Sequence, residues 1–219
     1  MTAVVSMSLL ASTAPNNTKF MDDLRTFCMG YASESVVPGY EWASLGRGTV
    51  VEVGGADGRI ALEVASQCPS IQFIVQGHAS TAAQAKSSSS KFDSSVSSRV
   101  QWMAHDYLEP QPTECKGAEA YLVQCSGRGW TDEYVAKVFG NVAAAMGPES
   151  KLLIADDLVP LDGASTTGQG RTTDDWTQLL AMSDSRLVIA RVVPPSRPGE
   201  VSVIEARRVS EFHVSFGFA

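Results

Sequence analysis

Three glycines between an apolar run and an amphipathic run are the first chemically suggestive feature of this chain. The stretch VVEVGGADG places Gly54, Gly55 and Gly58 where the pattern predicts a strand, a tight turn and a helix. Such a turn lets backbone N–H groups and the helix N-terminus approach a nucleotide-like cofactor. Tight turns also use glycine for purely steric reasons, so the turn alone leaves both explanations open.

The end of the second expected strand lacks an acidic residue. Dinucleotide sites usually carry a carboxylate at this point, about 20 residues after the glycine turn, to hold the ribose hydroxyls. Here the strand IQFIV is followed by Gln76 and Gly77. Each lost charge-assisted hydrogen bond removes about 1.5 to 3 kcal/mol of binding. The sequence therefore predicts a weakened adenosine site.

Arg128, in the stretch QCSGRGWTDE, follows the fourth expected strand, where parallel sheets usually keep reactive groups. A guanidinium stays protonated at any working pH and has no acceptor lone pair, so it cannot serve as a general base. As a fixed cation it would bind a carboxylate or stabilise a developing enolate. The competing interpretation is a solvated loop residue between two flexible glycines.

The composition excludes several classes of partner. Of the 219 residues, 44% are hydrophobic and 19% are charged, as in an ordinary single domain. The net charge is −7 and no basic cluster appears, so neither a nucleic acid nor a membrane is expected as a partner. The four cysteines form no CxxC pair and the three histidines are scattered. We therefore expect no metal site, reduced thiols and a cytoplasmic location.

Hydrophobic periodicity predicts strands that alternate with helices. Strands are expected at 49–53, 71–75, 99–107, 118–125 and 151–155, with a closing hairpin of 186–193 and 200–209. Helices are expected at 18–33, after Gly58, at 77–86, at 131–147 and at 172–183, with loops at 37–48 and in the serine-rich stretch 87–98. Thr131 is the expected N-cap of its helix. This order predicts an α/β, doubly wound sheet of seven strands, mostly parallel, with an antiparallel C-terminal hairpin.

Six motifs resemble, in order and spacing, the catalytic domain of fungal small-molecule O-methyltransferases of the caffeate type. They are VVEVGGADG, IQFIVQG, RVQWMAHDYLEPQP, YLVQCSGRGWTDEYVAKVFGNV, KLLIADDLVP and GRTTDDW. The resemblance runs from about Phe20 to Arg207 and implies a Rossmann-like class I methyltransferase fold that uses S-adenosylmethionine. We expect a flexible N-terminus at 1–17, a methyltransferase-like domain at 18–209 and a tail at 210–219.

The resemblance also implies roles for particular residues. Gly54, Gly55 and Gly58 correspond to the loop that cradles the cofactor, and Glu52 is the acidic residue of that motif. Asp106 and Tyr107 resemble the pair that meets the adenine, one through a hydrogen bond and the other through ring contact.

Several positions depart from the family pattern. Gly77 stands where the family has the ribose aspartate, and Arg128 and Gly129 stand where it has the catalytic histidine and a following aspartate. Asp156 matches one of the two acids that orient the histidine, whereas Gly170 replaces the other. The candidate catalytic residues are therefore Arg128 and Asp156. Loss of the base alone lowers a rate by ~10²- to 10⁴-fold.

Three functions are therefore weighed. The first is a methyltransferase-like protein of fungal secondary metabolism that has lost efficient methyl transfer and binds, or also cyclises or isomerises, a small aromatic or polyketide-like substrate. The others are an active S-adenosylmethionine-dependent O-methyltransferase and a non-catalytic partner subunit. The alternating apolar residues of the tail 210–219, and the lack of the family's N-terminal dimerisation domain before Phe20, favour a homodimer or a heteromeric partner.

Overall fold

The computed structural model describes residues 36–55, 57–77, 79, 82–124, 131–156, 158, 171–195 and 201–210. The expected helix at 18–33, the segment 1–17 and all but the first residue of the tail lie outside this set. Within it, no helix is long and apolar enough to cross a membrane.

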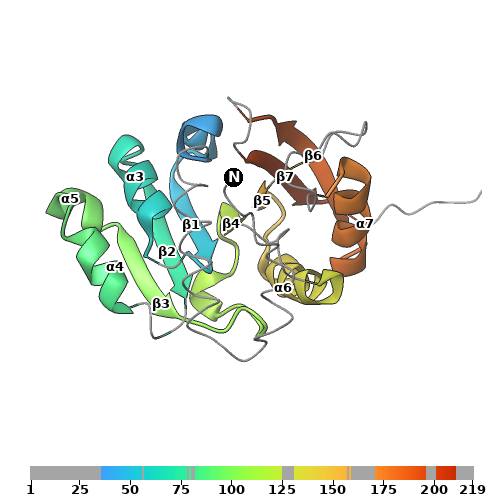
Figure 1. The fold of residues 1–219 in the computed structure, drawn as a ribbon, viewed down its shortest axis with the longest axis horizontal. Coiled ribbons are helices and arrows are strands. Elements are labelled where there is room, and N and C mark those ends of the chain that lie inside the picture. The colour runs from blue at the N-terminus through green and yellow to red at the C-terminus, as the bar shows by residue number, and fades with distance from the viewer. Residues whose placement is uncertain are drawn as a thin grey trace, which may run out of the picture.

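Seven strands form one sheet in the order β3-β2-β1-β4-β5-β7-β6 (Figure 1). Their bounds are β1 Gly48–Val53, β2 Ile71–Gly77, β3 Val100–Ala104, β4 Ala120–Gln124, β5 Lys151–Asp156, β6 Leu187–Val193 and β7 Ser202–Arg208. Strands β1 to β5 pair in parallel, and β7 runs antiparallel to both β5 and β6. The predicted α/β sheet with its antiparallel C-terminal pair is confirmed. Because the chain leaves β1 toward β2 and returns to its other side at β4, the strand order reverses there, and ligands bind beyond the carboxyl ends of strands at such a reversal.

The connecting helices also follow the sequence pattern. They are η1 Trp42–Leu45, α3 Arg59–Gln67, α4 Ala82–Ser89, α5 Ser94–Ser97, η3 Thr113–Cys115, α6 Asp132–Ala145 and α7 Thr173–Ser183. Figure 1 shows α3, α4 and α5 beside β1–β3, and α6 and α7 beside β5–β7. Thr131 caps α6 as expected, since its hydroxyl accepts a hydrogen bond from the backbone N–H of Tyr134 at 3.3 Å.

Two segments differ from their expected loops. The serine-rich stretch contains the last turn of α4 and all of α5, because the carbonyl of Asp93 accepts the N–H groups of Val96 and Ser97 and closes a turn without good helix formers. In the expected loop at 37–48, the indole N–H of Trp42 faces the carbonyls of Val36 and Val37 at 3.3 and 3.2 Å. These three side chains are buried, so this segment is part of the core.

The core has two layers, one on each face of the sheet, because side chains alternate along each strand. Val51 and Val53 of β1 pack with α6 and α7, whereas Val50 packs with α3. The apolar side chains of α3, which are Ile60, Leu62, Val64 and Ala65, are buried. This packing fixes the carboxyl ends of the parallel strands, where the candidate residues lie.

Candidate functional site

Buried polar side chains mark the carboxyl ends of four adjacent strands. Glu52, Gln76, Gln124 and Asp156 lie at the ends of β1, β2, β4 and β5, and each is at most 5% exposed. Their neighbours along each strand place Glu52 and Gln124 on the α3 face of the sheet, and Gln76 and Asp156 on the α6 face. Burial of polar groups is costly unless they are hydrogen-bonded, so their partners define the site.

Glu52 and Gln124 form a pair across the β1–β4 boundary. The Nε2 of Gln124 donates to the Oε1 of Glu52 at 2.6 Å. The Oε1 of Gln124 is buried and accepts no hydrogen bond from any described residue. Glu52 was predicted from the resemblance, whereas Gln124 was not predicted. The signal available in the sequence was a polar residue that ends an apolar strand.

The glycine turn lies directly over this pair. A Cβ on Gly55 would stand 2.5 Å from the carboxyl carbon of Glu52 and 2.7 Å from a methyl carbon of Val75. Gly54 and Gly58 have φ values of 76° and 67°, which L side chains rarely adopt. A Cβ on Gly58 would also stand 3.0 Å from the indole nitrogen of Trp102. The protein's own packing and backbone therefore require all three glycines, and the turn leads into the N-terminus of α3.

Asp57 connects this turn to α4. Its Oδ1 accepts the backbone N–H of Arg59 at 3.3 Å, and its Oδ2 accepts the hydroxyl of Ser88 at 2.9 Å. Neither Asp57 nor Ser88 was predicted as a site residue, because Ser88 lies in a stretch that the sequence favours as a mobile surface.

The residues predicted to meet an adenine ring, Asp106 and Tyr107, lie in the loop after β3. The N–H of His105 donates to the carbonyl of Gly77 at 3.1 Å, which ties this loop to the end of β2. Asp106 is exposed, and its Oδ1 accepts the N–H of Leu108 at 2.9 Å. The structure thus places Asp106 beside the same edge as the glycine turn, since the N–H of Gly55 donates to the carbonyl of Gln76.

Helix α6 holds Tyr107 in place. The Nδ2 of Asn141 donates to the carbonyl of Tyr107 at 3.2 Å, and the rings of Tyr107 and Tyr134 meet edge to face with centroids 6.4 Å apart. Asn141 is 8% exposed and was not predicted. Its signal was an amide on the buried face of an otherwise apolar helix.

No carboxylate of the described chain replaces the missing ribose ligand at the end of β2. Gln76 is fully buried, and its Nε2 donates to the Oε1 of Gln111 at 2.8 Å and to the Sγ of Cys115 at 3.3 Å. Burial raises the pKa of the Cys115 thiol, and the hydrogen bond from Gln76 opposes this rise. The side-chain amide of Gln76 is therefore used in hydrogen bonds inside the protein. Gly77 has no side chain that could bind a ribose hydroxyl.

Of the two candidate catalytic residues, the structure describes only Asp156. Arg128 lies outside the described residues, together with the rest of 125–130. Asp156 is 2% exposed, and its backbone is paired with Ser202 of β7.

Arg171 lies where the chain enters α7. Its Nη2 contacts the Oδ1 of Asp132 at 2.7 Å, and its guanidinium lies 5.2 Å from the ring centre of Trp176. Arg171 thereby joins the first turn of α6 to α7. It was not predicted, although the cation just before the capping residue of α7 was visible in the sequence.

The described residues contain no group of three or more histidines, cysteines or acids that could hold a metal ion. The described cysteines, Cys68 and Cys115, are free.

Solved structures share this architecture and define its class. NcsB1, an O-methyltransferase from neocarzinostatin biosynthesis in complex with S-adenosyl-L-homocysteine, superposes with a TM-score of 0.71 at 20% identity, over 94% of this chain and 62% of that one. A structure described as a pericyclic reaction enzyme superposes with a TM-score of 0.63 at 20% identity, over 78% of this chain and 45% of that one. The fold is that of the class I methyltransferases.

Sequence comparison then identifies the family. Residues 5–184 match the O-methyltransferase domain, and the chain belongs to that family, as the resemblance predicted. O-methyltransferase fsr2 of Gibberella fujikuroi is 30% identical over 191 residues, which are 79% of this chain and 49% of that protein. The chain thus spans about half the length of this curated relative.

Proposed function

We propose that the carboxyl edge of β1, β2 and β4 binds S-adenosylmethionine, and that the protein acts on a small aromatic or polyketide-like molecule of fungal secondary metabolism without efficient methyl transfer. The observation that carries the cofactor proposal is the buried Glu52–Gln124 pair beneath the glycine turn. It supports binding because a carboxylate and a carbonyl oxygen gathered under a turn of backbone N–H groups suit a zwitterionic ligand.

Buried polar atoms at this edge fit such a ligand. Among the described residues, the Oε1 atom of Gln124 and the Nε2 atom of His105 make no hydrogen bond. The indole N–H of Trp102, beside Gly58, also lacks a described acceptor. An unsatisfied buried polar atom costs about 1 to 3 kcal/mol, and a polar ligand at the same edge is one way in which that cost is recovered.

In this proposal, the glycine turn, the Glu52–Gln124 pair and the loop of Asp106 and Tyr107 bind different parts of S-adenosylmethionine. The backbone of the glycine turn and the N-terminus of α3 receive the carboxylate of the ligand, and Glu52 with Gln124 receives its ammonium group. Asp106 and Tyr107 hold the adenine by a hydrogen bond and by ring contact. S-adenosylmethionine supplies an electrophilic methyl group when bound. Because Gly77 offers no carboxylate to the ribose, we expect weaker affinity than a site with that acid would have.

The residue at the family's base position argues against efficient methylation. Arg128 stays protonated and cannot accept the proton of a hydroxyl substrate. Asp156 is 2% exposed at the end of β5, and this burial supports a role in orienting a neighbouring side chain over direct contact with a substrate. With the base absent, we expect a rate ~10²- to 10⁴-fold below that of a site with a histidine.

A second candidate function is the rearrangement of a bound substrate. A permanent cation at position 128 would stabilise an enolate or a carboxylate that forms during cyclisation or isomerisation. The fold is shared with the pericyclic reaction enzyme, which supports the idea that this fold can host a rearrangement. A rearrangement of this kind should lose its turnover in Arg128→Ala, whereas a non-catalytic partner subunit would be indifferent to that change.

Isothermal titration with S-adenosylmethionine tests the cofactor proposal. We expect saturable binding in the micromolar range by the wild type and at least tenfold weaker binding by Gln124→Leu, because this change removes both the orphaned carbonyl and the partner of Glu52. Gln101→Leu, an exposed change on β3, is the matched control and should bind as the wild type does. Absence of heat with the wild type would reject the proposal.

Pairing with a second copy or with another enzyme of the pathway is also proposed, on the grounds of the apolar tail. Light scattering at rising concentration tests it, and a monomer throughout would count against self-association.

A further inference from the structure

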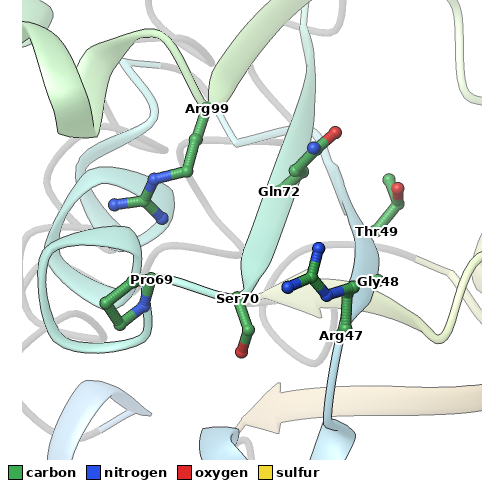
Figure 2. Close-up of a pocket in the computed structure, with 7 residues that line it drawn as sticks. All are labelled: Arg47, Gly48, Thr49, Pro69, Ser70, Gln72 and Arg99. Carbon is green, nitrogen blue, oxygen red and sulfur yellow. The ribbon is translucent and has the colours of Figure 1, made fainter.

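A cavity of about 230 Å³ lies at the opposite edge of the sheet, where β1, β2 and β3 begin. Its polar lining comes from the loops that enter these strands and from the first residues of β1 and β2, and consists of Arg47, Thr49, Ser70, Gln72 and Arg99 (Figure 2). The sites assigned to the cofactor lie at the other ends of the same strands. This cavity is therefore separate from the proposed methyltransferase site.

Two guanidinium groups and no carboxylate line this cavity. The chain as a whole carries a net charge of −7, so a local excess of positive charge is unusual for it. Among the described residues, neither Arg47 nor Arg99 takes part in a salt bridge. Neither guanidinium is therefore paired with an acid of the described chain at salt-bridge distance.

Arg99 is held rigidly by neutral acceptors. Its Nε donates to the carbonyl of Ser95 at 3.0 Å, and its Nη1 reaches the carbonyls of Cys68 and Ile71 at 3.3 and 3.0 Å. Its Nη2 donates to the carbonyl of Ala65 at 2.5 Å. Four of its five N–H groups are thus used by carbonyls of α3, α5, the residue after α3 and the first residue of β2, which leaves one donor and a fixed positive charge at the cavity wall.

Arg47 is the adaptable cation of the pair. Its side chain is exposed, and Figure 2 shows its guanidinium between Ser70 and Thr49. The hydroxyl of Ser70 donates to the carbonyl of Gly46 at 2.9 Å, so the two loops that flank Arg47 are joined. The planar guanidinium offers paired donors that match the geometry of an oxyanion.

One acid, Glu119 before β4, lies against a residue of this cavity, since a Cβ on Gly48 would stand 1.9 Å from its carboxyl carbon. Its Oε2 accepts the backbone N–H of Thr49 at 2.5 Å. Its charge opposes an anion in the cavity, but it does not line the cavity wall. Two guanidinium groups thus line a cavity that has this one carboxylate against it.

From these contacts we infer that the cavity binds a small phosphate-type oxyanion, with Arg47 as the direct ligand and Arg99 as a fixed second charge. The group is either free inorganic phosphate or the phosphate of a monoester. The inference does not depend on S-adenosylmethionine binding, because the two sites lie at opposite edges of the sheet.

Titration with inorganic phosphate and with ribose 5-phosphate, at constant ionic strength and followed by calorimetry, tests the inference. We expect saturable binding in the millimolar range by the wild type. Arg47→Gln should weaken it about ten- to hundredfold, because a charge-assisted contact is lost. Arg207→Gln removes an exposed guanidinium from β7, at a distance from the cavity, and is the matched control that should leave the affinity unchanged.

A comparison of the affinities for the two ligands identifies the source of the phosphate group. Tighter binding of ribose 5-phosphate than of phosphate points to a monoester ligand, and equal binding points to the free ion. Glu119→Gln should strengthen binding of both. The inference is overturned if phosphate does not saturate, or if Arg47→Gln and Arg207→Gln weaken it equally, since the effect would then be one of net charge alone.

Discussion

At the scale of single residues, the candidate site depends on a carboxylate that is removed from water. Glu52 is fully buried, and the amide of Gln124 is one of the groups that hold it. Hydrogen bonds to charged groups contribute more than those between neutral groups, and loss of one partner leaves the other desolvated. We therefore expect the Glu52–Gln124 hydrogen bond to stabilise the folded sheet and also to contribute to ligand binding.

We predict that Gln124→Leu lowers the free energy of unfolding by about 1.5 to 3 kcal/mol. The physical reason is the lost donor to a buried carboxylate. Urea denaturation followed by circular dichroism measures the change, with Gln101→Leu as the exposed control, which should stay within about 0.5 kcal/mol of the wild type. A Gln124→Leu protein as stable as the control would show that the hydrogen bond contributes little.

At the scale of secondary structure, α6 links two parts of the candidate site. It begins directly after the segment that contains Arg128, and its Asn141 and Tyr134 hold the loop of Tyr107. In the described part of the chain, the contacts of α6 with this site are therefore those with Tyr107.

We predict that Asn141→Leu weakens S-adenosylmethionine binding about two- to tenfold, because the carbonyl of Tyr107 loses its donor and the loop becomes less well ordered. Calorimetric titration measures the effect. Gln178→Leu, an exposed change on α7, provides the comparison. An unchanged dissociation constant in Asn141→Leu would separate this loop from the cofactor.

Helix α7 begins with a reciprocal capping box. The hydroxyl of Thr172 accepts the N–H of Asp175 at 3.2 Å, and the carboxylate of Asp175 accepts the N–H of Thr172 at 2.8 Å. We predict that Thr172→Ala costs about 1 kcal/mol of stability, as measured by urea unfolding near neutral pH.

The same cap has a definite pH dependence. Hydrogen bonds from Thr172 lower the pKa of Asp175, so its contribution is complete above the ordinary aspartate pKa and is lost as the pH falls through the lower folded value. The difference between wild type and Thr172→Ala should therefore shrink in acid. A constant difference down to pH 2 would contradict this assignment.

At the scale of the whole molecule, buried phenols make stability sensitive to alkali. The hydroxyl of Tyr121 donates to the carbonyl of Cys115 and lies 3.0 Å from that of Ala145. Burial raises the pKa of Tyr121 to about 12. Burial also raises the pKa of Tyr40, which donates to Glu205.

We predict that the unfolding free energy falls as the pH rises from about 10, the pKa of tyrosine in an unfolded chain, to about 12. The share of Tyr121 is at most about 2 to 3 kcal/mol, and it is fully present below pH ~10. Urea titrations from pH 8 to 12 measure it. In Tyr121→Phe the unfolding free energy should fall less steeply with pH. Identical slopes in the two proteins would show that Tyr121 does not contribute to the pH dependence.

The sequence predicted the sheet well because its central strands β1, β2, β4 and β5 are mostly buried on both faces and read as nearly unbroken apolar runs. Polar partners were harder to predict, because Gln76 meets Gln111 and Cys115 only after β2 and η3 have been brought together by the fold. The segment around Trp42 was expected to be a loop for the same reason. Its burial depends on contacts with Phe73 and other distant residues that local patterns do not contain.

The motifs assigned to the cofactor could be predicted from the sequence because they are short and contiguous, and their role stays a prediction. Their neighbours Asp57 and Ser88 could not, since a hydrogen bond across 31 residues leaves no periodic signal. The two residues proposed here to bind an oxyanion, Arg47 and Arg99, also come from separate loops, and only the sheet places them at one cavity.

In the proposed function, the permanently charged Arg128 takes the base position of the O-methyltransferase family. The most direct test is the rate at which S-adenosylhomocysteine forms when the protein is incubated with S-adenosylmethionine and a panel of phenols, for the wild type and for Arg128→His. We predict slow turnover by the wild type and at least tenfold faster turnover by Arg128→His. The ratio of the two rates should grow as the pH rises past about 6.5, because the histidine is then deprotonated. Wild-type turnover on the order of 1 s⁻¹ or faster on an ordinary phenol would contradict it.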